Sequence, residues 1–303
     1  MGNNQKSKIM VTGGTGLLGK GLEKAAPKGL KVISAHLRDY EVKGPKNAEH
    51  IVADVLDKSK IDALFEKYKI SAVIHGAGIA NVDYVESHYD ESYISNINGT
   101  KNIAEACKRH GSYLIYISTN AVFDGKNAPY SETDLINPIN SYGKIKAECE
   151  KLVFEILPDS AVARPILMYG WNHPQTRQNP VTWMISRLAK GEPLKLVNDV
   201  FENPLYNIQC AETLWAMTQK RARGITHIAG GEIINRYDFG LKTAEVFGFD
   251  KSLISAVDSS FFPAIAPRPK NTSFNTHKMF RESGIKPLSV TEGLMRMKQE
   301  AQE

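Results

Sequence analysis

The sequence predicts an α/β protein with a Rossmann-type, doubly wound parallel sheet and a smaller C-terminal substrate-binding lobe. Short apolar runs alternate with longer segments of helical periodicity through the first half of the chain. A glycine-rich turn, TGGTGLLG at residues 12–19, follows the first run and opens the first helical segment. After residue 163 this alternation gives way to segments rich in Pro, Trp, Asn and Gln.

The expected strands and helices alternate in order along the chain. The predicted strands are residues 8–11, 30–35, 50–53, 71–75, 113–118 and 160–163. The predicted helices between them are residues 17–26, 61–68, 89–109 and 142–157. Strands joined by such helices form parallel sheets with right-handed crossovers. We therefore expect an NAD(P)-binding domain over 1–163, completed by returning segments near 205–230, and a mainly substrate-binding lobe over 164–303.

Composition restricts the class of protein. The chain has 303 residues and a net charge of +5, without a run of more than two Lys or Arg, which argues against nucleic-acid binding. Cys107, Cys149 and Cys210 are widely spaced and form no CxxC or Cys/His cluster, so we expect a reducing compartment and no metal site. No apolar run reaches 18 residues and the N-terminus is polar, which predicts a cytoplasmic protein without a membrane partner.

The glycine-rich turn carries the first functional prediction. Gly13, Gly16 and Gly19 allow a tight turn, close approach of the backbone to a pyrophosphate, and close packing of helix against sheet. The helix that follows offers unpaired N–H groups to the phosphate. A glycine turn without a ligand is the alternative. The strand before the turn and the helix after it favour a dinucleotide.

The end of the second strand bears on which dinucleotide binds. NAD-binding proteins usually place Asp or Glu there to bind the ribose 2′-OH. Here that position holds His36, and Arg38 follows two residues later. A guanidinium suits the extra phosphate of NADP, so NADP(H) is preferred and NAD(H) is the alternative, with Arg38 then an ordinary surface charge. Asp54, after the third strand, either binds the adenine amino group or caps the next helix.

A tyrosine and a lysine lie four residues apart in a predicted helix and so share one face. They are Tyr142 and Lys146. The ammonium is expected to lower the pKa of the phenol, which can then protonate a carbonyl oxygen as hydride reaches the carbon. One such pair is expected by chance. Its position supports the prediction, because Thr119 ends the fifth strand in the same crevice. Asn96 is a polar residue within the long helix, where a surface position is the alternative.

Several motifs in order resemble a known family. TGGTGLLG, VIHGAG, NINGT, ISTNAVFDG, YGKIK and ARPILMYG resemble the extended short-chain dehydrogenase/reductase superfamily. Within it, the chain is most similar to the dTDP-4-dehydrorhamnose reductases, on the segments AGIANVDYVE, STNAVFDG, PYSETDLINPINSYG, DVFENPLY and RPKNTSFNTHKM. The resemblance spans nearly the whole chain, and the ordered set is more specific than any one motif.

The resemblance implies roles for individual residues. Thr119, Tyr142 and Lys146 would be catalytic, and Asn96 would support Lys146 through its backbone and a water. Val82 and Asp83 would face the sugar, and Arg268 would lie near its diphosphate. The implied cofactor contacts are Gly13, Thr15, Gly16, Leu17, Leu18, Arg38, Asp54, Val55, Ala77, Gly78, Asn96, Tyr142 and Lys146. A homodimer is expected from the superfamily, and no residues are assigned to a metal.

The chain departs from the reductase pattern on the substrate side. Asn120 and Ala121 replace the Asp-Tyr that follows the catalytic threonine in these reductases. They also differ from the Asp-Glu pair of sugar-nucleotide dehydratases, which disfavours dehydration. The segment DVFENPLY lacks the glycine of the corresponding reductase pattern. The identity of the sugar is therefore the weakest part of the resemblance.

Three functions remain open from the sequence. The first is an NAD(P)H-dependent reductase of a nucleotide-linked 4-keto-6-deoxy sugar. The second is a sugar-nucleotide epimerase that keeps NAD(H) bound, against which the missing acid at His36 counts. The third is a non-catalytic NADP-binding subunit, because the regulatory β subunit of methionine adenosyltransferase resembles the same reductases.

Overall fold

A computed structural model describes residues 8–38, 45–173, 175–263 and 265–302 of the protein. Its centre is a seven-stranded sheet in which every pairing is parallel. The strands, in spatial order, are β11 (Gly224–Ile228), β6 (Ala161–Pro165), β5 (Tyr113–Ile117), β4 (Ile70–His75), β1 (Lys8–Thr12), β2 (Lys31–His36) and β3 (Ala48–Val52). The predicted α/β fold with a parallel sheet is confirmed, with small shifts in strand boundaries.

The strand order reverses beside β1. The chain runs outward from β1 through β2 to β3, and then returns to β4 on the other side of β1. In open parallel sheets, such a reversal opens a crevice at the carboxyl ends of the strands, because the connections on either side diverge. The fold therefore places the ends of β1, β4 and β5 around one crevice.

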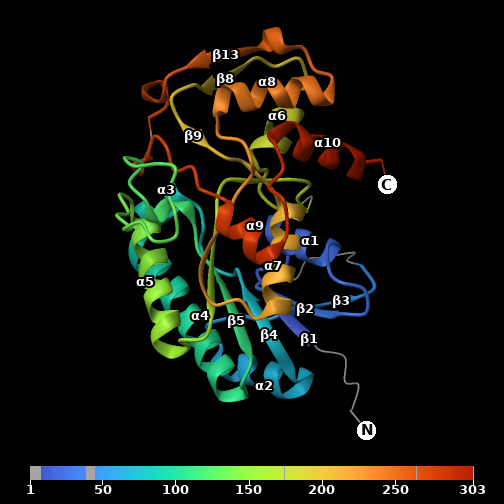
Figure 1. Cartoon of the computed structure of the whole chain (residues 1–303), viewed down its shortest axis with the longest axis vertical. Helices are drawn as coiled ribbons and strands as arrows, with labels where there is room; N and C mark the ends of the chain where they lie inside the picture. The colour runs from blue at the N-terminus through green and yellow to red at the C-terminus, as the bar shows by residue number, and fades with distance from the viewer. Residues whose placement is uncertain (1–7, 39–44, 174, 264, 303) are drawn as a thin grey trace.

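Helices cover both faces of the sheet (Figure 1). Side chains alternate along each strand, so Ile9 and Val11 pack into one apolar cluster and Met10 into the other. The helices on the first face are α1 (Leu17–Lys24), α7 (Asn207–Lys220) and α9 (His277–Ser283). Those on the second face are α2 (Lys58–Tyr68), α4 (Tyr89–His110) and α5 (Ser141–Ile156). The two apolar clusters fix the sheet and thus the positions of the strand ends.

Helix α7 holds the first helix of the chain in place. The Trp215 indole N–H donates to the Leu22 carbonyl at 3.0 Å, and the Asn207 amide donates to the Leu17 carbonyl at 3.0 Å. A Cβ on Gly21 would lie 2.8 Å from the Asn207 carbonyl oxygen, so the two helices approach closely. Residues from the second half of the chain thus support the loop that precedes α1.

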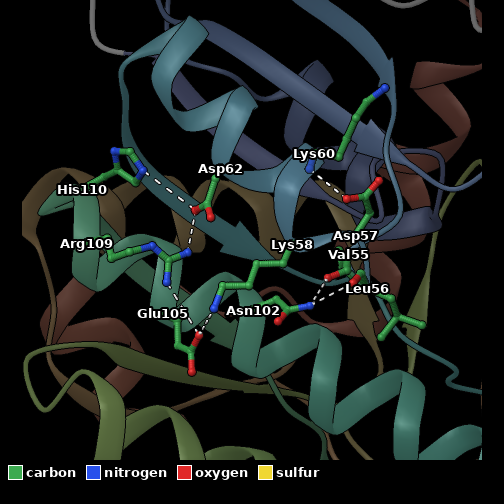
Figure 2. Close-up of polar contacts among 10 residues, drawn as sticks. All are labelled: Val55, Leu56, Asp57, Lys58, Lys60, Asp62, Asn102, Glu105, Arg109 and His110. Carbon is green, nitrogen blue, oxygen red and sulfur yellow. Dashed lines mark hydrogen bonds and ion pairs between the residues drawn. The ribbon is translucent and has the colours of Figure 1, made fainter.

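Polar contacts join α2 to α4 on the outer surface (Figure 2). Lys58 Nζ lies 3.1 Å from Glu105 Oε2, and Arg109 Nη2 lies 2.5 Å from Asp62 Oδ1. The Asn102 amide donates to the Val55 carbonyl at 3.0 Å, which holds the turn before α2. Exposed ion pairs of this kind contribute about 0–1 kcal/mol each, so the buried faces dominate the stability of this layer.

The C-terminal part of the chain packs around a third apolar cluster, at the top of Figure 1. Tyr169, Phe239 and Leu294 are among its fully buried members. Its helices are α6 (Pro180–Leu188), α8 (Arg236–Phe247) and α10 (Val290–Glu300). Its short strand pairs are β7 (Met168–Tyr169) with β10 (Leu205–Tyr206), β8 (Leu194–Val197) with β13 (Ile254–Val257), and β9 (Phe201–Glu202) with β12 (Ile234–Asn235).

Three short helices complete the described chain. They are η1 (Asn120–Val122), η2 (Lys251–Leu253) and η3 (Ser259–Phe261), while α3 (Val82–Ser87) precedes α4. Strand β11 lies in the central sheet although it comes from the second half of the sequence. The domain division near residue 163 stays a prediction. None of the helices in the described ranges is both long and apolar enough to span a membrane.

Candidate active site

The glycine-rich turn is held directly to the sheet. The Gly13 and Gly14 N–H groups both donate to the Ala35 carbonyl, at 2.9 and 3.1 Å. Gly13 has φ +77°, a left-handed conformation that favours glycine. A Cβ on Gly19 would lie 2.2 Å from the Gly14 carbonyl oxygen, so the helix can pack this closely only because residue 19 lacks one.

Helix α1 presents its N-terminus without a side-chain cap. Its N-cap is Gly16, and no acidic residue lies in the first turn. The first N–H groups of a helix lack intrahelical partners and carry a partial positive charge, so they bind anions. Gly16, Leu17 and Leu18 line a cavity at this point. The turn thus has the space and the donors that a pyrophosphate requires.

This cavity has a volume of about 400 Å³ and lies along the carboxyl ends of β1, β4, β5 and β6. It joins most of the predicted site residues. Those that line it are Gly13, Gly16, Leu17, Leu18, Ala77, Gly78, Asn96, Thr119, Tyr142 and Lys146. One cavity is therefore shared by the glycine turn, the N-terminus of α1 and the three proposed catalytic side chains. This arrangement fits a nicotinamide dinucleotide.

Lys146 is a buried residue of the cavity lining. Its Nζ donates to the Ile117 carbonyl at 2.5 Å and lies 4.3 Å from the centre of the Tyr116 ring. Burial lowers the pKa of Lys146 to about 8, although Glu150 on the same helix opposes the shift. The ammonium is therefore held at a fixed place at the end of β5.

Tyr142 differs from the sequence-based expectation in its acidity. The lysine was expected to lower the pKa of the phenol, yet burial raises the pKa of Tyr142 to about 12. A hydrogen bond with Thr119 opposes the rise without cancelling it. Desolvation is the largest cause of the shift, and Lys146 does not counter it, because its ammonium donates its hydrogen bond to the Ile117 carbonyl instead. Tyr142 consequently keeps its proton well above neutral pH, as a proton donor must.

Thr119 is buried at the end of β5 and has three polar neighbours. Its Oγ1 accepts the Ala121 N–H at 3.1 Å and donates to Asn120 Oδ1 at 3.3 Å. The third neighbour is Tyr142. Asn120 also lines the cavity and was named in the sequence only as a departure from the reductase pattern. Its position directly after the strand end was the signal that could have placed it in the site.

Two residues that sequence reasoning missed shape the wall beside β4. Thr12 Oγ1 lies 2.7 Å from His75 Nδ1 and accepts the Ala77 N–H at 3.2 Å. Burial lowers the pKa of His75 to about 3, so its ring is neutral at physiological pH. This network fixes the start of the loop that contains Gly78. Both residues end a strand, which is the pattern that identified Thr119.

Asn96 is 3% exposed within α4, so it is not the surface residue that was the alternative. Its amide donates to the Ser92 carbonyl at 2.8 Å and to the Ile79 carbonyl at 3.3 Å. Its own carbonyl accepts the Cys149 thiol at 3.6 Å. A Cβ on Gly78 would lie 2.3 Å from Asn96 Oδ1, so the asparagine packs against this loop. Support of Lys146 by Asn96 through a water stays a prediction.

Four predicted cofactor residues lie outside the cavity lining: Thr15, Arg38, Asp54 and Val55. Arg38 is exposed beyond β2, and its carbonyl oxygen lies 2.6 Å from His36 Nδ1. Asp54 accepts the Leu56 N–H at 2.9 Å, while Asp57 caps α2. Asp54 is therefore not the helix cap that was its alternative role, and its contact with adenine stays a prediction.

The predicted substrate residues other than Thr119 lie outside that lining as well. Arg268 Nη2 lies 2.8 Å from Asp83 Oδ2, and Asp83 Oδ1 accepts the Ala266 N–H at 3.1 Å. Asp83 and Val82 begin α3. The structure thus brings Asp83 and Arg268 together, 185 residues apart in sequence, in an ion pair with each other.

Comparison with known proteins adds family information to this geometry. The RmlD substrate binding domain model matches residues 7–303. A dTDP-4-dehydrorhamnose reductase from Aggregatibacter actinomycetemcomitans is 30% identical over 93% of this chain and 95% of its own length. The methionine adenosyltransferase 2 subunit beta of Danio rerio is 26% identical over 90% of this chain and 84% of its own. The structure of a dTDP-4-dehydrorhamnose reductase from Bacillus anthracis in complex with NADP superposes with a TM-score of 0.84 at 26% identity, covering 97% of this chain and 99% of that one.

Proposed function

The chain belongs to the RmlD substrate binding domain family, and we propose on that premise that it reduces the keto group of a nucleotide-linked 4-keto-6-deoxy sugar. The observation that carries the proposal is the shared cavity: an uncapped helix N-terminus and Thr119, Tyr142 and Lys146 all border it. A reductase needs a dinucleotide phosphate site and a proton donor in one space. Relatives named as reductases of such sugars support the choice of substrate.

The chemistry follows from the protonation states in the cavity. NADPH, when bound, supplies the hydride that adds to the carbonyl carbon. Tyr142, whose pKa burial raises to about 12, gives its phenolic proton to the carbonyl oxygen, and the product is an alcohol. Thr119 holds that oxygen near the phenol. Lys146 stabilises the phenolate that the transfer leaves behind, because its pKa of about 8 leaves much of it protonated at neutral pH.

The decisive experiment is turnover with and without the phenol. We expect stoichiometric NADPH oxidation with dTDP-4-keto-6-deoxyhexoses, and a loss of kcat of about 10²- to 10⁴-fold in Tyr142→Phe. Tyr93→Phe is the matched control, because its hydroxyl bonds Glu148 at 2.5 Å on the helix surface. Tight NADPH binding without turnover across a panel of keto-sugar nucleotides would overturn the reductase proposal.

The preferred cofactor is NADP(H), and the proposal rests on Arg38 and on the NADP bound by the Bacillus anthracis reductase. A guanidinium that bonds the 2′-phosphate contributes about tenfold to affinity. Arg38→Ala is therefore expected to weaken NADPH about tenfold and to leave NADH unchanged. Arg109→Ala, which removes a surface arginine paired with Asp62, is the control. Equal loss for both cofactors, or none, would show that the assignment is wrong.

A second candidate is a binding subunit that acts on a partner enzyme. The specific observation is the match to methionine adenosyltransferase 2 subunit beta over nearly the same span as the match to the reductases. The ion pair between Arg268 and Asp83 is compatible with this role, because Arg268, the residue predicted to bind a diphosphate, is paired with a carboxylate instead. The turnover panel separates the two candidates. A homodimer, expected from the superfamily, stays a prediction that sedimentation would test.

A further inference from the structure

A buried carboxylate approaches the catalytic threonine from the C-terminal part of the chain. Glu202 on β9 is 9% exposed, and its Oε2 lies 2.7 Å from Arg236 Nη2 at the start of α8. Its other oxygen, Oε1, accepts the Asn120 side-chain N–H at 3.4 Å. Asn120 follows Thr119 directly and bonds it. A chain of polar contacts therefore runs from α8 to the proposed proton-transfer site.

The contacts decide which way the Asn120 amide faces. A carboxylate paired with a guanidinium has only acceptor atoms, so the nitrogen of the amide must face Glu202. That nitrogen also donates to Thr272 Oγ1 at 2.6 Å, which uses its second hydrogen. The amide oxygen is then left for Thr119, whose Oγ1 donates to it at 3.3 Å. Every polar group of the amide has one defined partner.

The orientation of Asn120 in turn sets the hydroxyl of Thr119. A threonine hydroxyl has a single hydrogen, and its oxygen already accepts the Ala121 N–H. With the amide oxygen of Asn120 beside it, Thr119 meets only an acceptor in Asn120, and its single hydrogen is shared between Asn120 Oδ1 and the phenolic oxygen of Tyr142. With the amide reversed, Thr119 would accept from Asn120 and turn its hydrogen elsewhere. The proton arrangement at Tyr142 therefore depends on the orientation of Asn120, which is set by Glu202, a residue outside the cavity lining.

We propose that Glu202 is a positioning residue, which fixes the Asn120 amide and through it the Thr119 hydroxyl for proton transfer. The proposal rests on the proposed function, since the hydroxyl it positions is the one assigned to the reaction. Arg236 has a supporting role, because its ion pair holds Glu202 in the orientation that faces Asn120. The segment that carries Glu202 is thereby coupled to the chemistry without contacting the substrate.

A double-mutant cycle tests this coupling. In Glu202→Gln, Arg236 attracts the new carbonyl oxygen, so the new amide nitrogen faces Asn120 and reverses it. In Asn120→Asp, two acceptors face each other across 3.4 Å. Each single variant is expected to lose about tenfold in kcat/KM, the effect of one misplaced hydrogen bond. The double variant restores a donor facing an acceptor, with Thr119 still donating to residue 120.

The double variant is therefore expected to return to within about threefold of the original kcat/KM. A merely structural role would not give this recovery, because two damaging substitutions would then multiply. Glu212→Gln is the matched control, since it weakens another glutamate–arginine pair, with Arg296 at 2.6 Å, away from the cavity. Multiplied losses, or equal effects of Glu202→Gln and Glu212→Gln, would overturn the proposal.

A second measurement does not depend on turnover. The side-chain amide resonances of Asn120, assigned by their disappearance in Asn120→Asp, are expected to shift in Glu202→Gln and to stay in place in Glu212→Gln. If the original protein shows no turnover but this shift is observed, the proposed reductase activity is overturned, whereas the coupling of Glu202 to Asn120 is supported. If the amide resonances of Asn120 are unchanged in Glu202→Gln, the coupling of Glu202 to Asn120 is overturned, whether or not the protein reduces a sugar.

Discussion

The predicted cofactor side and the predicted substrate side of this molecule are built by different means. Around the glycine turn, the contacts are made by backbone groups: the Gly13 and Gly14 N–H groups bond the Ala35 carbonyl, and Gly16 begins α1 without a side-chain cap. On the substrate side, charged side chains pair across long sequence separations. These pairs are Asp83–Arg268, Asp199–Lys270 and Glu202–Arg236.

The difference shows where specificity can change. A site made of backbone donors leaves few residues to vary, because each glycine is required by close approach rather than by a side-chain interaction. A site made of ion pairs can be altered by single substitutions that preserve the fold. This agrees with the sequence, in which the departures from the reductase pattern lie at Asn120 and near Glu202, whereas the glycine turn is intact.

The largest effect is expected on the cofactor side, from Gly19→Ala. The added Cβ would lie 2.2 Å from the Gly14 carbonyl oxygen, which is backbone and can move only with the turn itself. Strain of this kind costs about 1–3 kcal/mol, which corresponds to up to about a hundredfold loss of NADPH affinity. Titration calorimetry measures it.

Gly29→Ala is the control for this substitution. Gly29 has φ +80°, yet a Cβ there would meet no atom within 4 Å. It should cost about 1 kcal/mol of unfolding free energy and leave NADPH affinity unchanged. Equal affinity loss in both variants would mean that Gly19 acts through stability alone and that the turn does not hold the cofactor.

A smaller effect on kcat/KM is expected from a change of pH, through Lys146, which lies between the predicted cofactor and substrate sides. Its pKa is lowered to about 8, so its ammonium is lost as the pH rises through that value, whereas Tyr142 keeps its proton up to a pKa of about 12. If the ammonium stabilises the phenolate, kcat/KM should fall about fivefold between pH 8 and pH 9. The pH–rate profile measures it.

Lys146→Arg sharpens this prediction. Arginine stays protonated over the whole range, so whatever activity remains should lose the alkaline limb near pH 8. A limb that persists unchanged in Lys146→Arg would assign the titration to another group. A profile of the original protein that is flat from pH 7 to pH 10 would contradict the role given to the ammonium.

The residues of the two sides are not equally predictable from the sequence, for physical reasons. The glycine turn, Tyr142, Lys146 and Thr119 are local patterns: a strand followed by a helix, a spacing of four, a hydroxyl at a strand end. The structure places all of them on one cavity. Such patterns can be recognised from the order and spacing of residues that are close together in the sequence.

The contacts that sequence reasoning missed are not local. Glu202 and Thr272 reach Asn120 from 82 and 152 residues away, which no spacing rule anticipates. The pKa of Tyr142 differs from the sequence-based expectation for a related reason, because the sequence shows a lysine four residues away and not the burial that raises the pKa. Desolvation depends on the whole fold, so the direction of the pKa shift of Tyr142 is evident only from the structure.

The smallest effect is expected on the substrate side, from Asp83→Asn. Both partners of the Asp83–Arg268 pair are about two-fifths exposed, so the pair contributes at most about 1 kcal/mol. Loss of the carboxylate would leave Arg268 available to a diphosphate, and KM for the sugar nucleotide should fall about threefold with kcat unchanged. Asp199→Asn, which removes the ion pair of Lys270 in the same part of the molecule, is the control. A higher KM in Asp83→Asn would instead mean that Asp83 itself binds the substrate, and that the ion pair positions it to do so.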